Sequence, residues 1–139
     1  MDNTLARNVV ASPLDNIDTA FEGMRSAGTG AVMVLPDDSY LFNLRRRIIE
    51  KLEAAKLPSM FGLREAVDDG GLMSYGERLS RSHFRAAYFV EQIVNGTTPA
   101  DLPVEQPTKF ELVINLKTAK TLGLTLPPSL VARADEVIE

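Results

Sequence analysis

The 139-residue sequence has no cysteine, which excludes disulfides, thiolate zinc sites and cysteine nucleophiles. It also lacks an excess of positive charge: the net charge is −4 at pH 7, and the one compact basic run, residues 45–47, has acidic neighbours. Because nucleic-acid binding normally rests on a basic face, we predict no nucleic-acid partner.

Long apolar runs are absent too. No stretch approaches the ~20 residues that a membrane-spanning helix needs. The N-terminal residues 1–15 show no basic segment followed by an apolar one, as an export signal would. As written, the chain is therefore expected to stay in the cytoplasm. Its composition, 45% apolar and 24% charged, is that of one ordinary globular domain.

Short apolar runs alternate with helical patterns through the first half of the chain. The helical stripe that starts at Ile17 closes at Gly28, where a left-handed residue suits a helix end. Such alternation predicts an α/β fold, a parallel sheet flanked by helices with right-handed crossovers. The predicted strands are 8–11, 30–35, 57–61 and 72–75. The predicted helical segments are 17–24, a helix that follows the turn at 36–39 and carries Leu44, Ile48 and Leu52, and 64–67.

The second half begins with a longer helix from about Ser80 to the pair Asn95 and Gly96. Its stripe consists of Phe84, Ala87, Tyr88, Glu91 and Val94. Residues 97–108 are rich in proline and threonine, which predicts an extended connection. A strand at 110–115, a helix at 117–122 and a last helix from Pro128 to Ile138 should follow.

Three motifs carry a resemblance to a known family. They are GLMSYG at 71–76, PADLPVEQP at 99–107 and FELVINLKTAK at 110–120, with VLPD at 34–37 in the expected order upstream. On these motifs the chain resembles the C-terminal part of ABC-transporter solute-binding proteins of the tryptophan and tyrosine type. The resemblance implies one incomplete lobe of a type I periplasmic binding protein, plus a C-terminal crossover segment.

The resemblance also implies a division of the chain and a set of partners. Residues 1–79 would form the partial second lobe, and residues 80–139 the crossover helix, connection, strand and terminal helices, packed on the same core or on a partner's. It implies a small amino-acid-like solute, an ABC permease in the full-length context, and a periplasmic location. It implies no cofactor, no metal and no bond chemistry. Family members are about twice this length, so a first lobe and the opening strand-helix unit of the second lobe are expected to be missing.

Three loops that follow predicted strands are candidates for the solute site, because ligands of open parallel sheets bind beyond the carboxyl ends of strands. An amino-acid-like solute needs donors for its carboxylate, a carboxylate for its ammonium and an aromatic surface for a ring. The candidate residues are Asp37, Asp38, Tyr40, Arg64, Ser74 and Tyr75. Structural readings compete: Asp37 and Asp38 also suit a turn and helix cap, and Arg64 could pair with Glu65 on the surface.

An enzyme is not predicted. His83 is the single histidine and has no nucleophile elbow beside it, and the glycines at 28 and 30 precede a strand instead of a helix. The leading hypothesis is a solute-binding fragment of an import system. The alternative is a truncated remnant that binds no solute and acts only as a self-associating module. An incomplete parallel sheet leaves unpaired edges, so we expect a homodimer or larger homo-oligomer, with exchange of C-terminal segments as one route.

Overall fold

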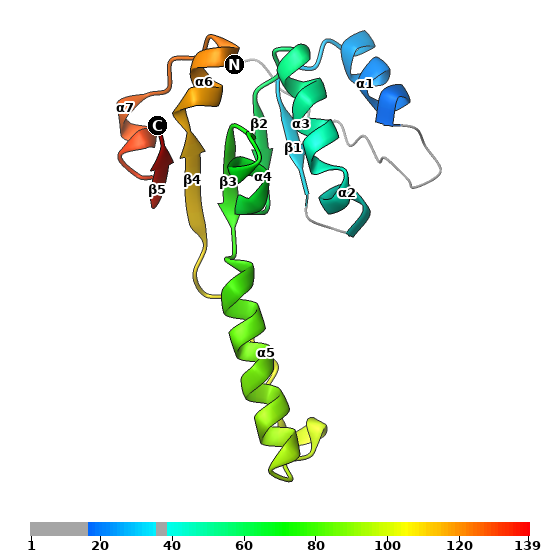
Figure 1. Cartoon of the computed structure of the whole chain (residues 1–139), viewed down its shortest axis with the longest axis vertical. Helices are drawn as coiled ribbons and strands as arrows, with labels where there is room; N and C mark the ends of the chain where they lie inside the picture. The colour runs from blue at the N-terminus through cyan, green and yellow to red at the C-terminus, as the bar shows by residue number, and fades with distance from the viewer. Residues whose placement is uncertain (1–16, 36–38) are drawn as a thin grey trace, which may run out of the picture.

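A computed structural model describes residues 17–35 and 39–139 of the chain. Its centre is one five-stranded sheet with the strand order β1-β2-β3-β4-β5, which confirms the predicted α/β architecture (Figure 1). The strands are β1 (Val32–Val34), β2 (Ser59–Phe61), β3 (Met73–Gly76), β4 (Glu111–Asn115) and β5 (Glu136–Ile138). The strand predicted at 8–11 lies outside the described residues.

The helices are α1 (Ile17–Ser26), α2 (Ser39–Asn43), α3 (Arg45–Ala54), α4 (Arg64–Asp68), α5 (Leu79–Val94), α6 (Leu116–Leu122) and α7 (Pro128–Val131). Two of them end as predicted, because Gly28 after α1 and Gly123 after α6 both take positive φ angles. The single helix predicted after the turn at 36–39 is divided into two helices, α2 and α3. The extended connection also contains one 3₁₀ turn, Pro99–Asp101, that the sequence pattern did not indicate.

The core lies between the sheet and the helices that cover its front face. Ile48, Ile49 and Leu52 of α3 pack with Phe61 of β2, and Ile17 of α1 completes this side. Side chains alternate along a strand, so Phe61, Ser74 and Val113, which pair across β2, β3 and β4, share this face. The apolar residues whose i, i+3, i+4 spacing predicted helices here are therefore residues that pack in the core.

The opposite, back face of the sheet carries a row of methionines. Met33, Met60 and Met73 are paired in register across β1, β2 and β3. Met33 is 65% exposed, and Leu35 beyond it is also exposed. The described part of the chain therefore leaves this apolar face partly open to solvent.

Three arginines at the start of α3 are engaged in ion pairs. Arg45 and Arg46 lie 2.7 and 2.9 Å from the two carboxylate oxygens of Asp69, and Arg47 lies 2.8 Å from Asp18 of α1. Hydrogen bonding from Arg46, together with the charges of both arginines, lowers the pKa of Asp69. The basic run of the sequence thus joins α3 to its neighbours.

Strand β4 runs antiparallel to β3, whereas the sequence pattern predicted parallel neighbours. The reason is the path of the chain after β3. Helix α5 projects away from the sheet and the segment after it returns alongside, so the chain re-enters at the edge it left (Figure 1). The pairs β1 with β2 and β2 with β3 are parallel as predicted, and β4 pairs with β5 in parallel orientation as well.

The predicted last helix over 128–138 is wrong in its second half. Helix α7 stops at Val131, and Glu136–Ile138 form the edge strand β5. Val137 and Ile138 are β-branched and pair with β4, while the backbone N–H of Asp135 donates to the carbonyl of Leu112 at 2.9 Å. Over so short a segment, the spacing of the apolar residues is compatible with a helix or with a strand. Residues 136–138 form a strand because they pair with β4.

The close approach of two backbones at the end of β3 leads to a prediction. A Cβ added to Gly76 would lie 1.8 Å from the carbonyl oxygen of Gly62. We expect Gly76→Ala to lower the free energy of unfolding by about 1–3 kcal/mol, measured by urea denaturation. Gly23→Ala is the control, because nothing lies within 4 Å of a Cβ there. It should raise the stability by about 0.5–1 kcal/mol; equal effects of the two changes would contradict the close approach.

Candidate functional site

The carboxyl ends of β1, β2 and β3 lie at one edge of the sheet, from which α5 projects (Figure 1). Because β4 is antiparallel to β3, the starts of β4 and β5 lie at this edge as well. We call it the site edge. Ligands of open α/β sheets bind in the crevice outside the carboxyl ends of the strands, so this edge is where a solute site is expected.

Three of the six candidate residues belong to the segment after β1. Asp37 and Asp38 lie outside the described residues. Tyr40 is placed only as a member of helix α2. Their roles therefore stay predictions.

Arg64 begins α4 and lies at the site edge, but its guanidinium is already paired. Nη1 and Nη2 donate to the two carboxylate oxygens of Glu136 at 2.8 and 2.9 Å, and Nε donates to Asp68 at 3.3 Å. The predicted surface partner, Glu65, is not the one used. These hydrogen bonds raise the pKa of Arg64 and lower that of Glu136. A solute carboxylate would have to share or replace these carboxylates to bind Arg64.

The charges around Arg64 extend along the edge to the start of α5. Arg78 lies 2.8 Å from Glu111 at the start of β4 and 3.9 Å from Glu136. Arg81 is 3.8 Å from Glu111, whose side chain is largely buried. The network connects four elements, α4, α5, β4 and β5. It positions the crossover helix relative to the sheet.

Ser74 and Tyr75 differ sharply in exposure. Ser74 is 1% exposed and faces the covered side of the sheet, so its hydroxyl is not presented to solvent. Tyr75 is 53% exposed, and its ring stacks on Phe110 with 5.7 Å between ring centroids and 25° between planes. Tyr75 is therefore the accessible aromatic group of the GLMSYG motif, and Ser74 shapes the strand beneath it.

The alternation of side chains along the strands places the Tyr75–Phe110 pair and the Arg64 network on opposite faces of the sheet. Tyr75 pairs with Leu112 on the back face, whereas Glu136 shares the front-face row with Val113 and Ser74. The aromatic pair and the Arg64 network thus reach the same edge from opposite faces. A solute lying across the edge, instead of on one face, could contact both.

The sequence argument missed Phe110, Glu111 and Glu136 as residues of this edge. Phe110 and Glu111 are the first two residues of the FELVINLKTAK motif. The family resemblance therefore pointed to this segment, but it did not indicate that the segment lies at the site edge. The two residues reach the edge only because β4 runs antiparallel to β3. A strand read as parallel would have placed them at the far end of the sheet.

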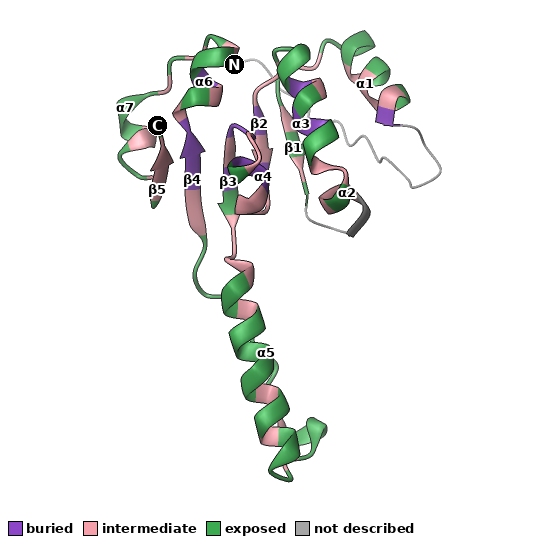
Figure 2. Cartoon of the chain, in the orientation of Figure 1, coloured by how far each residue is buried: buried purple, intermediate pink, exposed green. Residues whose placement is uncertain are grey.

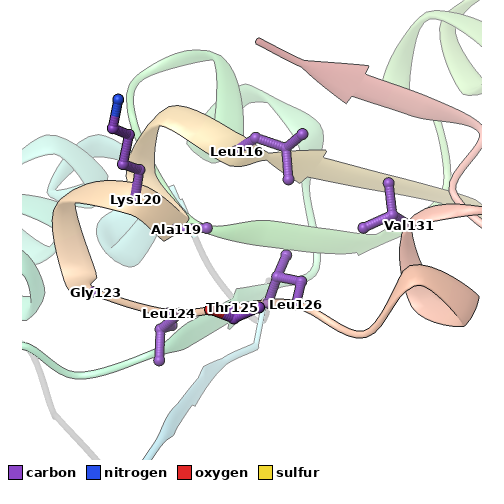
Figure 3. A pocket seen from close by; sticks show the side chains of 8 residues that line it. All are labelled: Leu116, Ala119, Lys120, Gly123, Leu124, Thr125, Leu126 and Val131. Atoms are coloured by element: carbon purple, nitrogen blue, oxygen red, sulfur yellow. The ribbon is translucent and has the colours of Figure 1, made fainter.

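Other features of the described residues lie away from the site edge. A depression of about 380 Å³ lies between α6 and the chain leading to α7, lined by Leu116, Leu126 and Val131 among others (Figure 3). It adjoins the carboxyl end of β4, which is the opposite end of the sheet. Residues 17–35 and 39–139 hold no group of three or more histidine, aspartate or glutamate side chains placed to bind a metal.

A helix long and apolar enough to cross a bilayer is not found in the part of the chain that the structure describes. The sheet, its covering helices and the polar edge define an α/β lobe, an architecture in which ligands bind beyond the carboxyl ends of strands. The family model described as ABC transporter substrate binding protein matches residues 4–138, and the chain belongs to this family. The resemblance seen in the sequence motifs is confirmed. No curated protein matches the sequence.

Solved structures show the same fold. A conserved domain protein from Vibrio cholerae superimposes with a TM-score of 0.80 at 25% identity, over 87% of this chain and 40% of that one. The ABC domain from Streptococcus pneumonia in complex with L-Trp gives 0.78 at 27% identity, over 88% and 41%. An open, ligand-free substrate-binding protein from Clostridium difficile gives 0.58 at 17% identity, over 90% and 42%. The chain thus spans about 40% of the length of the first two.

The Arg64–Glu136 pair predicts a pH dependence of stability. Because the pKa of Glu136 is lowered in the folded chain, its contribution is present above the unfolded value of about 4.3 and is lost as the pH falls through the lowered value. Glu136 is partly exposed, so we expect Glu136→Gln to cost at most about 1 kcal/mol at pH 7.

The measurement is urea denaturation of the wild type and Glu136→Gln between pH 7 and pH 3. The difference in free energy of unfolding should narrow as the pH falls below about 4. Glu50→Gln on α3 is the control, since Glu50 is exposed and has no ion pair among the described residues. A difference that stays constant with pH would contradict the pairing.

Proposed function

We propose that this protein is a solute-binding component of an ABC import system and that it binds a small amino-acid-like solute at the site edge. The family supports substrate binding and transport. The observation that carries the proposal is the exposed Tyr75–Phe110 stack, placed at the strand ends beside the Arg64 network. The aromatic pair offers a surface for a solute ring, and the network offers both signs of charge.

The kind of solute follows from the groups at the edge. Arg64 and Arg78 supply donors for a carboxylate, and Glu136, at the start of β5, supplies an acceptor for an ammonium group. The relative from Streptococcus pneumonia, 27% identical, was solved in complex with L-Trp. An aromatic amino acid therefore heads the list of solutes to be tested. Asp37, Asp38 and Tyr40 remain proposed members of the same site.

The proposal also covers the location of the protein and its partner. We propose a periplasmic location and an ABC permease as the partner, both on the strength of the family. Since the chain spans about 40% of its solved relatives, the site edge would form one side of the binding cleft. The proposal involves no bond-making or bond-breaking step.

A thermal-shift panel of amino acids, including L-tryptophan, tests the proposal on the 139-residue chain. A solute that binds the folded state should raise the unfolding temperature with increasing concentration. We expect Tyr75→Ala to weaken binding about two- to tenfold, the loss of one aromatic contact. Tyr75→Phe keeps the ring and should bind nearly as the wild type does. If no amino acid shifts the transition, or Tyr75→Ala binds normally, solute binding at this edge is wrong.

A second candidate function is self-association of the chain as an interaction module. The observation that favours it is helix α5, on which none of the side chains is buried (Figure 2). Phe84 is 81% and Val94 79% exposed. Exposed apolar side chains on a projecting helix are typical of an interaction surface.

A further inference from the structure

The face of Arg64 that could bind a solute carboxylate is filled by the protein's own Glu136. Nη1 and Nη2 of Arg64 donate to the two oxygens of the Glu136 carboxylate at 2.8 and 2.9 Å. This is the two-bond geometry in which arginine recognises carboxylates in general. The side chains of Arg64 and Glu136 are 22% and 42% exposed, so the pair is open to a solute. Glu136 therefore stands where the carboxylate of an amino acid would bind.

The other arginine contacts at the site edge do not have this form. Arg78 meets Glu111 through Nε at 2.8 Å. Asp68 contacts Arg64 as well, but at the longer distances of 3.3 and 3.4 Å. Among the described residues of this edge, the Arg64–Glu136 pair is thus the contact that a solute carboxylate would reproduce bond for bond.

Release of Glu136 from Arg64 requires a rotation of side chains and no change in the sheet. The backbone of β5 is held by its pairing with β4, and the N–H of Asp135 donates to the carbonyl of Leu112 at 2.9 Å. Exposed side chains change rotamer rapidly, and partly exposed ion pairs contribute little to stability. A solute carboxylate can therefore replace that of Glu136 while β5 stays in place.

The displaced carboxylate of Glu136 needs another cation. Arg78 lies 3.9 Å from Glu136, but it is already paired with Glu111. The carboxylate of the solute and that of Glu136 would then lie side by side and repel each other. An α-amino acid carries its ammonium group on the carbon next to its carboxylate, so the solute itself brings the cation that Glu136 has lost. A carboxylic acid without an ammonium group brings none.

We propose that Glu136 is a built-in competitor of the solute. It occupies Arg64 in the free protein, is displaced by the solute carboxylate, and then accepts a hydrogen bond from the solute ammonium group. Glu136 is thereby a specificity-determining residue, which selects an α-amino acid against the carboxylic acid with the same ring. This role of Glu136 rests on the proposed binding of a solute at the site edge, and it explains why a zwitterion is preferred there.

Isothermal titration calorimetry of the 139-residue chain with L-tryptophan and with 3-indolepropionate measures this preference, because the second compound lacks only the ammonium group. We expect the wild type to bind L-tryptophan at least about tenfold more tightly than 3-indolepropionate. If another amino acid of the thermal-shift panel binds more tightly than L-tryptophan, it and its own analogue without the ammonium group take their place. Equal binding of the two compounds by the wild type would overturn the proposal.

Glu136→Gln removes the competing carboxylate and leaves no second negative charge beside the solute. We therefore expect 3-indolepropionate to bind this variant about tenfold more tightly than it binds the wild type. The preference for L-tryptophan should shrink by at least the same factor, because its ammonium group loses a charged partner. A variant that merely folds less well would not gain affinity for any compound.

Asp68→Asn is the matched control for Glu136→Gln. It removes the same charge beside Arg64 but leaves Glu136 on Nη1 and Nη2, so the preference for L-tryptophan should stay at the wild-type value. An equal gain of affinity for 3-indolepropionate in both variants would indicate a general effect of charge and overturn the role of Glu136. The absence of any gain in Glu136→Gln would overturn it too.

Failure of this role and failure of solute binding give different results. If the wild type binds an amino acid but Glu136→Gln keeps the wild-type preference, Glu136 is not a competitor, whereas solute binding at the edge stands. If no amino acid of the panel binds the wild type, the proposed function is wrong, and the role of Glu136 falls with it.

Discussion

The antiparallel pairing of β3 with β4 is the contact on which the rest of this arrangement depends. The chain leaves the sheet at Gly76 and re-enters it at Glu111, directly opposite. A parallel β4 would require the chain to travel back to the other end of the sheet before pairing. The return at the same edge keeps α5 and its return segment outside the sheet, and it brings Phe110 beside Tyr75. It also directs β5, which runs parallel to β4, so that Glu136 starts near Arg64.

In the proposed function, the charge network at this edge would have two roles that compete. Arg64, Arg78, Glu111 and Glu136 hold the start of α5 against the sheet by ion pairs. The pair of Arg64 with Glu136 is partly exposed, unlike the one made by the largely buried Glu111, and partly exposed pairs typically contribute below about 1 kcal/mol. Because little is gained from each pair, exchanging a protein carboxylate for a solute carboxylate costs little. A weakly held arginine is thus better suited to ligand exchange than one in a buried pair.

Local patterns were enough to predict most elements of this fold. The helical stripe that ends at Gly28, the apolar run around Val32–Val34 and the helix ending at Gly123 are all present. The failures concern long-range pairing. The direction of β4 depends on the path of α5, and residues 136–138 form a strand because β4 offers an open edge beside them. For the candidate site, the sequence predicted that Arg64 and Tyr75 follow strands at the carboxyl edge of the sheet, and the structure has them there. The sequence did not indicate that Glu136 would pair with Arg64 or that Ser74 would be buried.

The methionine row on the back of the sheet has a chemical consequence. Met33, Met60 and Met73 are in register across three strands, and the outermost thioether is well exposed. Oxidants convert methionine into its sulfoxide, a polar and chiral group, and reductases reverse the change. Each oxidised sulfur would make an apolar face more polar without breaking any strand pairing, since only side chains are altered. Oxidation of this row would thus make the back face less apolar, in a chain that has no thiol to react with oxidants.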